Sequence, residues 1–199
     1  MAKTKKTIAV DIDEVLMPHF QDLIDWYNKQ YGTELTALDN HPTDPRPWGT
    51  DSFEEAIRRV HRFFDTQTFK NSMPFSEAKQ AVLELSRNYK MIVITARDTI
   101  LERATKDWLD EHFKELFTAT HFTARYNLEG EIQTKASVAL ANKTDYLIDD
   151  ALDHCEDAAK VGIKALLFGE YPWNQSDKLP KGVVRVKNWQ EVLDYFEGR

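Results

Sequence analysis

Short apolar runs alternate with amphipathic helical patterns along most of the chain. The runs are rich in Val, Ile, Leu and Phe, and most of them end at polar residues. They cover residues 7–10, 91–94, 119–122, 145–148, 164–168 and 183–186. Such alternation predicts an α/β fold, in which a doubly wound, Rossmann-like parallel sheet carries helices on both faces.

Helical patterns fill most of the intervals between these runs. Apolar residues recur at helical spacing over 77–89 and again after residue 150, where Cys155 joins a stripe of alanines that stops at Gly162. The segment from Thr99 to Glu102 has the spacing of a capping box, which predicts that a helix starts at Thr99. The amphipathic segment 188–196 is expected to pack on the sheet as a last helix.

The interval between the first two strands departs from this alternation. Two helical patterns follow one another there, separated by a loop with Pro45, Pro47 and Trp48. Their apolar stripes are Phe20, Leu23, Ile24, Tyr27 and Tyr31 in the first, and Phe53, Ile57, Val60 and Phe64 in the second. We predict a core domain of residues 1–16 and 74–199 and a small helical cap of residues 17–73, which would act as a lid over the strand ends.

Composition and charge narrow the class of protein. The 199 residues are 42% hydrophobic and carry a formal net charge of -7, with acidic and basic residues interleaved. A chain without a basic stripe is a poor partner for polymeric nucleic acid, and no window is apolar enough to span a bilayer. The chain has one cysteine and no signal-like apolar segment near its start. We expect a cytoplasmic protein that acts on a small molecule, without a membrane partner.

Polar residues stand at the ends of several predicted elements. They are Asp11 and Asp13 after the first strand, Thr95 after the second, Lys135, and Asp149 with Asp150 after the fourth. Because side chains alternate along a strand, Asp11 and Asp13 are expected to face one crevice. Clustered carboxylates need a cation or a shared proton, and Mg²⁺ prefers oxygen ligands. We therefore predict a divalent metal on Asp11 and one carboxylate of the Asp149 and Asp150 pair.

In this order the residues resemble the motifs of the haloacid dehalogenase-like phosphohydrolases, and the likeness covers nearly the whole chain. That family carries Asp-x-Asp-x-Val or Thr after one strand, Thr or Ser after another, then a Lys, and an acidic pair after a further strand. The resemblance implies a phosphatase that hydrolyses a phosphate monoester through an aspartyl-phosphate, with Mg²⁺ as the cofactor.

The resemblance also implies a role for each acidic residue. Asp11 would be the nucleophile, and Asp13 would act as general acid and then as general base. Asp11, the main-chain carbonyl of Asp13 and the carboxylate of Asp150 would bind Mg²⁺. Asp149 would hold these ligands in place without binding the metal itself.

Three further residues would bind the phosphate group. The hydroxyl of Thr95 and the amide of Ala96 would donate hydrogen bonds to phosphate oxygens. Lys135 would supply a compact positive charge to the same group.

Within this superfamily the chain is most similar to the 5'(3')-deoxyribonucleotidases. They too have a small helical cap directly after the first motif, and a Lys shortly before a Leu-Ile-Asp-Asp ending. Aromatic residues of their cap stack on the base of a nucleotide, and the matching positions here are His19 or Phe20, and Trp48. The chain departs from their pattern at Glu14, where they carry glycine, and at Arg97, where a Thr-Ser-Pro loop becomes Thr-Ala-Arg.

Several of these residues also have a purely structural interpretation. Trp48 is equally expected to fasten the proline-rich loop to a helix. Arg97 is at least as much expected to form a structural salt bridge as to reach a substrate phosphate. We expect His19 to be a surface histidine and Cys155 to lie in the core. Trp173 either lines the entrance of the site or anchors the loop after a strand, and we favour the anchor.

The sequence leaves alternatives to a nucleotidase. They are a phosphatase for a sugar phosphate or another metabolite, transfer of the phosphoryl group to a second acceptor, and a protein that binds a phosphorylated ligand or a partner protein without turnover. A two-component receiver domain also uses an acid pair, a Thr and a Lys. Receivers are much shorter and lack an inserted cap, so this class does not fit the organisation of the chain.

Overall fold

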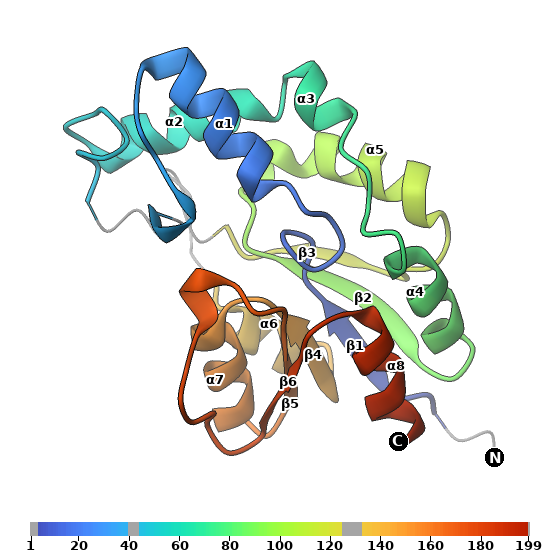
Figure 1. Cartoon of the computed structure of the whole chain (residues 1–199). Coiled ribbons are helices and arrows are strands. Elements are labelled where there is room, and N and C mark those ends of the chain that lie inside the picture. Colours follow the sequence, from blue (N-terminus) through green and yellow to red (C-terminus); the bar gives the residue numbers. More distant parts are fainter. Residues whose placement is uncertain (1–3, 40–43, 125–132, 199) are drawn as a thin grey trace.

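The computed structural model describes residues 4–39, 44–124 and 133–198, which build a six-stranded parallel sheet (Figure 1). The strands lie in the order β3-β2-β1-β4-β5-β6. Their bounds are β1 Thr7–Val10, β2 Lys90–Thr95, β3 Thr120–Phe122, β4 Tyr146–Asp149, β5 Lys164–Phe168 and β6 Val183–Val186. Each strand matches a predicted run to within one residue at either end, so the α/β prediction is confirmed.

Helices cover both faces of this sheet. One face carries α4 (Ala78–Ser86), α5 (Glu102–Phe113) and α8 (Trp189–Glu197), and the other carries α6 (Lys135–Ala141) and α7 (Leu152–Lys160). Every residue of β1 and β4 is buried. Strands covered on both sides read as unbroken apolar runs, which is why they were visible in the sequence. No helix among the described residues is both long and apolar enough to cross a membrane.

The centre of the sheet contains a topological switch point between β1 and β4. From β1 the chain winds to β2 and β3 on one side, and it returns to β4, β5 and β6 on the other. The N–H of Asp11 donates to the carbonyl of Ile148 at 3.0 Å, and the pairing of Ala9 with Leu147 puts Asp11 opposite Asp149. The two strand ends therefore border one crevice, which is where open α/β sheets bind ligands.

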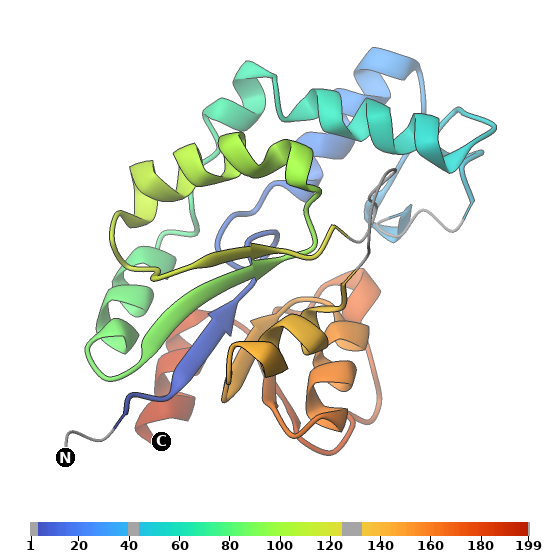
Figure 2. The same ribbon diagram turned by 180° about the vertical axis from the view of Figure 1, so that it is seen from behind.

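The described residues between β1 and β2 form α1 (Phe20–Tyr31), the 3-10 helix η1 (Ala37–Asp39), α2 (Phe53–Phe63) and α3 (Gln67–Lys70). In both views these helices lie together beyond the carboxyl ends of the central strands (Figure 2). The predicted stripe of α1 is buried, except that Tyr31 is half-buried. Apolar side chains of these helices and of the sheet form one cluster. The division into a core and a cap at residues 17 and 73 stays a prediction.

The predicted apolar stripe of α2 is wrong in part. Ala56 and Phe63 are the buried residues of this helix, whereas Phe53 is 38% exposed. Ile57 and Val60 are half-buried because they face a cavity. Phe64 of the predicted stripe is buried. An apolar cavity wall and a packed core give the same periodicity in a sequence, so the pattern did not distinguish the two.

The start of α5 also differs from the prediction. A 3-10 turn, η2 (Thr99–Leu101), precedes this helix, and Asp98 is its N-cap. The carboxylate of Asp98 accepts a hydrogen bond from the N–H of Ile100 at 3.1 Å. The hydroxyl of Thr99 donates to the same carboxylate at 3.3 Å. The cap is therefore one residue earlier than the capping-box spacing indicated.

Candidate active site

The crevice at the switch point gathers three buried carboxylates. Asp11 follows β1, whereas Asp149 ends β4 and Asp150 follows it. Each residue offers an oxygen atom, and these atoms lie within 4.8 Å of one another. The exposed fractions are 4% for Asp11, 0% for Asp149 and 8% for Asp150. Carboxylates this close repel one another unless a cation or a proton offsets their charge.

Lys135 is the cation that meets these carboxylates. It is the first residue of α6, and Thr134 caps this helix by accepting a hydrogen bond from the N–H of Ser137 at 3.0 Å. The Nζ of Lys135 lies 2.7 Å from Oδ2 of Asp11 and 2.7 Å from Oδ2 of Asp149. Burial alone would lower the pKa of Lys135, but the two carboxylates outweigh burial and raise it. Lys135 therefore stays protonated and carries a positive charge in the site.

Both oxygen atoms of Asp149 are engaged by protein groups. Oδ1 accepts a hydrogen bond from the N–H of Ala151 at 3.1 Å and lies 3.2 Å from Nδ1 of His154. Oδ2 accepts a hydrogen bond from Lys135. Burial would raise the pKa of Asp149, but Lys135 and His154 outweigh burial and hold it well below its usual range. Asp149 is therefore ionised, with its charge already paired.

Asp11 and Asp150 have fewer hydrogen-bond partners than Asp149 among the described residues. Oδ1 of Asp11 is buried and has no hydrogen-bond partner among the described residues. Burial raises the pKa of Asp11 to about 6, and burial together with the neighbouring carboxylates raises the pKa of Asp150 well above its usual range. Magnesium typically takes its protein ligands from one or two carboxylates. The donor atoms and the unpaired negative charge therefore fit a hard divalent cation.

Asp13 has different partners from Asp11. The Nε of Arg97 donates to both carboxylate oxygens of Asp13 at 3.1 Å, and Nη1 of Arg97 donates to the hydroxyl of Thr105 at 3.0 Å. Burial would raise the pKa of Asp13, but Arg97 and then His19 outweigh burial and lower it to about 2. The salt-bridge interpretation of Arg97 is therefore confirmed.

The prediction that His19 lies on the surface is wrong. Its side chain is buried, with its ring centroid 6.2 Å from that of Phe63 and 6.1 Å from that of Phe64. Nδ1 of His19 lies 3.3 Å from Oδ1 of Asp13. A residue just before a helix reads as exposed in a sequence, but here the inserted helices fold over it.

Thr95 and Ala96 stand at the carboxyl end of β2, the neighbour of β1 in the sheet. Thr95 is fully buried, and its hydroxyl oxygen accepts a hydrogen bond from the N–H of Arg97 at 3.3 Å. The carbonyl of Thr95 accepts another from the N–H of Thr123 at 2.9 Å. Ala96 is half-buried. The carboxyl end of β2 is thus held to the segment that follows β3.

A cavity of about 180 Å³ opens between the inserted helices and the end of β2. Most of its wall is apolar, and it includes Phe20, Leu23, Trp48, Ala56, Ile57, Val60, Phe64 and Leu101. Asp13, Ala96 and Arg97 also line it, and His61 adds an imidazole. Burial lowers the pKa of His61. The cavity therefore joins an apolar space to residues of the predicted site.

Trp48 fastens its loop, as the structural interpretation predicted, and it also borders the cavity. Its ring meets that of Tyr27 edge-on, with 5.1 Å between the centroids, and the hydroxyl of Tyr27 donates to the carbonyl of Trp48 at 2.8 Å. The side chain of Trp48 is also part of the cavity wall. The residue thus fastens the proline-rich loop to α1 and contributes to the cavity.

Glu14 has a structural role that the sequence analysis did not assign. Its φ angle is +57°, in the left-handed region that favours glycine. Its Oε1 accepts hydrogen bonds from the N–H groups of His19 at 2.7 Å and of Phe20 at 2.8 Å. Glu14 therefore caps α1 from outside the helix. Its departure from the glycine of the nucleotidase pattern was the signal that pointed to this position.

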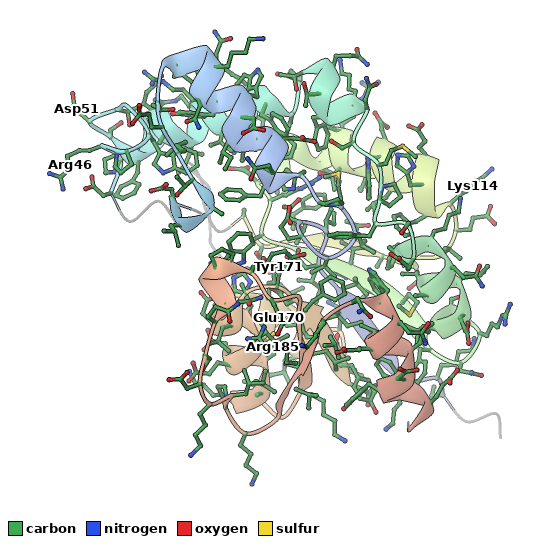
Figure 3. All side chains as sticks on the ribbon, in the orientation of Figure 1. Arg46, Asp51, Lys114, Glu170, Tyr171 and Arg185 are labelled. Carbon is green, nitrogen blue, oxygen red and sulfur yellow. The ribbon has the colours of Figure 1, made fainter. Side chains whose placement is uncertain are left out.

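The segment after β5 reaches back to the acidic cluster. It contains the 3-10 helix η3 (Pro172–Asn174), in which Nε1 of Trp173 donates to Oδ2 of Asp150 at 2.7 Å. Asn174 donates from Nδ2 to the carbonyl of Asp150 at 2.9 Å, and Arg185 donates to Oδ1 of Asn174 at 3.0 Å. Figure 3 shows Tyr171 and Arg185 in this region. Trp173 therefore contacts the acidic cluster as well as the loop that it was expected to anchor.

Comparison with solved structures shows the class to which this fold belongs. A haloacid dehalogenase-like family hydrolase from Streptococcus pneumoniae matches with a TM-score of 0.72 and 17% identity, over 96% of this chain and 98% of that chain. A HAD-hydrolase from Bacillus subtilis, bound to magnesium, matches with a TM-score of 0.64 and 10% identity, over 97% and 99% of the two chains. The fold is that of a haloacid dehalogenase-like hydrolase.

Sequence comparison then shows the family. The model of the family described as 5' nucleotidase, deoxy (pyrimidine), cytosolic type C protein matches residues 5–197, so the chain belongs to this family. A 5'(3')-deoxyribonucleotidase from Bacillus subtilis (strain 168) is 25% identical over 194 residues, which are 94% of this chain and 96% of the relative. The protein is therefore a hydrolase of the phosphatase and nucleotidase class, and the resemblance seen in its motifs is confirmed.

Proposed function

We propose that the protein is a Mg²⁺-dependent phosphomonoesterase that hydrolyses a (deoxy)nucleoside monophosphate through an aspartyl-phosphate on Asp11. The environment of Asp11 is the observation that carries this proposal. Lys135 binds one carboxylate oxygen at 2.7 Å, and the other oxygen has no partner among the described residues. A carboxylate with one oxygen held and one free is suited to attack phosphorus in line.

The reaction would use two steps. Oδ1 of Asp11 forms a bond to phosphorus while the ester bond breaks, and the leaving alkoxide takes a proton from Asp13. Water then attacks the phosphorus of the aspartyl-phosphate while Asp13 takes a proton from this water. The bond between phosphorus and Asp11 breaks, which restores the carboxylate of Asp11 and releases free phosphate. Thr95, the amide of Ala96 and Lys135 would bind the phosphate oxygens and stabilise the charge that develops on them.

Asp13 needs a proton to act as the acid in the first step. Its low pKa, about 2, rests on its contacts with Arg97 and His19. We propose that these contacts loosen when the substrate enters, because an ionised Asp13 has no proton to give. The cavity borders both Asp13 and Arg97, so a bound substrate would reach this pair.

The divalent cation would be held by Asp150, by the main-chain carbonyl of Asp13 and by Oδ2 of Asp11, because Oδ1 of Asp11 attacks phosphorus. Asp149 would support the site from outside, which agrees with the engagement of both its oxygen atoms. When bound, Mg²⁺ would neutralise charge on the oxygens of the transferred group. The magnesium-bound hydrolase of the same fold supports this choice of metal.

The cavity supports a nucleotide as the substrate. An aromatic and aliphatic wall that includes Phe20 and Trp48 suits the flat face of a base, and neutral His61 adds a hydrogen-bonding group. The family description and the Bacillus relative support the same class of substrate. We further propose that residues 17–73 act as a cap that closes over the phosphate during the reaction.

The assay below tests three alternatives to nucleotide hydrolysis, and transfer of the phosphoryl group to a second acceptor is one of them. A protein that binds a phosphorylated ligand without turnover is favoured by one observation, the ion pair that keeps Asp13 deprotonated. A sugar phosphate fits the cavity less well, because most of the lining side chains cannot hydrogen-bond to hydroxyl groups.

The test is phosphate release from p-nitrophenyl phosphate and from a panel of 5' and 3' nucleotides, with and without Mg²⁺. We expect Asp11→Asn to lower kcat by about a thousandfold or more. Asp22→Asn, which changes an exposed carboxylate on α1, is the matched control and should keep wild-type rates. Phosphate release that persists in Asp11→Asn contradicts the proposed intermediate. Nucleotide binding without phosphate release supports the silent alternative, and a phosphorylated alcohol in the products supports transfer.

A further inference from the structure

The orientation of Asp150 is set by the segment after β5. Its Oδ2 accepts the hydrogen bond from Trp173, and its main-chain carbonyl accepts the hydrogen bond from Asn174. Asn174 is fully buried and also donates to the carbonyl of Phe168 at 3.0 Å. The donors to Asp150 thus come from a turn that is tied to the end of β5.

The indole of Trp173 is held from two sides. It stacks on the ring of Tyr171, with the centroids 4.8 Å apart and the planes at 5°, and it meets Phe20 edge-on, with the centroids 5.4 Å apart. The hydroxyl of Tyr171 donates to the carbonyl of Glu14 at 2.8 Å. The indole N–H cannot turn away from Asp150 without disturbing these contacts, so the donor is preorganised.

We propose that Trp173 is a positioning residue for the divalent-cation site. Its N–H donates to Oδ2 of Asp150 and fixes the carboxylate, so that Oδ1 is left to bind the cation. The inference rests on the proposed function, because it concerns the cation that this function uses. Hydrogen-bond donors that orient metal ligands from outside typically change metal affinity by about 10-fold to 100-fold.

The same side chain links the acidic cluster to the inserted helices. Phe20, which meets the indole, is the first residue of α1 and lines the cavity. Glu14, whose carbonyl binds Tyr171, caps the same helix. Trp173 therefore contacts both the acidic cluster and the first turn of α1.

The test measures Mg²⁺ binding directly, without any substrate. Isothermal titration calorimetry compares the wild type with Trp173→Phe, which keeps an aromatic ring but lacks the N–H group. Trp108→Phe is the matched control, because Nε1 of Trp108 also donates a buried hydrogen bond, to the carbonyl of Ser72 at 2.8 Å, away from the acidic cluster. We expect Trp173→Phe to weaken Mg²⁺ binding by about tenfold or more and Trp108→Phe to leave it unchanged.

A spectrum of the wild-type protein gives a second readout. The chain has five tryptophans, and labelling them with ¹⁵N gives one indole N–H resonance for each. We expect Mg²⁺ to shift the resonance that is missing from Trp173→Phe, and to leave the resonance missing from Trp108→Phe in place.

The outcomes separate this inference from the proposed function. Unchanged Mg²⁺ affinity in folded Trp173→Phe overturns the positioning role and leaves Mg²⁺-dependent hydrolysis standing. A wild type that binds no Mg²⁺ overturns both. If Trp173→Phe does not fold, Tyr171→Leu removes the stacked ring while the indole N–H stays. A several-fold loss of affinity in this variant supports the role, and unchanged affinity overturns it.

Discussion

The amine of Lys135 lies 2.7 Å from the carboxylate of Asp11, although the two residues are far apart along the chain. The contact forms because α6 begins with Lys135 beside the end of β4, and β4 is paired with β1. One buried lysine thereby offsets the charges of Asp11 and Asp149.

Loss of this lysine should weaken both the fold and the activity. Lys135→Met leaves Asp11 and Asp149 buried without their cation, so we expect the free energy of unfolding to fall by about 3–5 kcal/mol. Urea unfolding followed by circular dichroism measures this change. Lys79→Met, at an exposed position of α4, is the control and should stay close to the wild type. A loss below about 1 kcal/mol in Lys135→Met would show that the buried charges find other partners.

The stabilisation of the fold by Mg²⁺ should grow as the pH rises. The pKa of Asp11 is raised from 3.8 to about 6. The protonated carboxyl of Asp11 therefore stabilises the folded state fully below pH 4, and this stabilisation is lost as the pH rises through 6. The loss amounts to about 3 kcal/mol for a shift of this size, and a bound cation offsets it. We expect Mg²⁺ to raise Tm little at pH 5 and clearly at pH 7. An equal rise at both values, or a rise that persists in Asp150→Asn, would contradict the proposed ligands.

The pair of Arg97 and Asp13 should show a measurable coupling energy. Unfolding of Arg97→Met, Asp13→Asn and the double variant at pH 7 should give a coupling of about 1–2 kcal/mol. Because the pKa of Asp13 is lowered to about 2, the stabilisation is fully present above pH 4 and is lost as the pH falls through 2. Strictly additive effects at pH 7 would mean that the ion pair adds no stability.

Substitutions of Glu14 should separate backbone strain from helix capping. Glu14→Gln keeps an acceptor for the N–H groups of His19 and Phe20, so it should stay close to the wild type. Glu14→Gly relieves strain of about 1 kcal/mol but loses the cap, for a net loss of up to about 1 kcal/mol. Glu14→Ala keeps the strain and loses the cap, so it should lose about 2 kcal/mol. Thermal unfolding measures the order of stability of the three variants. An alanine variant as stable as the glycine variant would contradict backbone strain at the φ angle of +57°.

Substitution of Trp48 should impair the hydrolysis of nucleotides more than the hydrolysis of phosphate esters without a base. Stacking of a base on an aromatic ring contributes about 1–3 kcal/mol, so Trp48→Leu should raise KM for a deoxyribonucleoside monophosphate by about tenfold. Hydrolysis of glycerol phosphate by the same variant should stay within about threefold of the wild type and serves as the internal control. Equal losses on both substrates would indicate that Trp48 only fastens its loop.

The strands and the acidic cluster were predictable because local rules determine them. A buried parallel strand is an unbroken apolar run, and polar residues at its carboxyl end reach the crevice whatever the helices do. The contacts of His19, the cap formed by Glu14 and the cavity-facing side of α2 were not predictable. Each depends on how the inserted helices dock on the sheet, and periodicity does not distinguish a side chain in a core from one in a cavity wall.

The cavity has an evolutionary consequence. Most of its wall comes from the segment between β1 and β2, whereas the acidic cluster is fixed by the main-chain ladder of the central strands. Natural selection can therefore alter which molecule is accepted by changing the inserted helices, and leave the reactive groups in place. A chimaera can be made in which residues 17–73 are replaced by the matching segment of a relative with another substrate preference. It should take the substrate preference of the relative and keep the reaction of this chain.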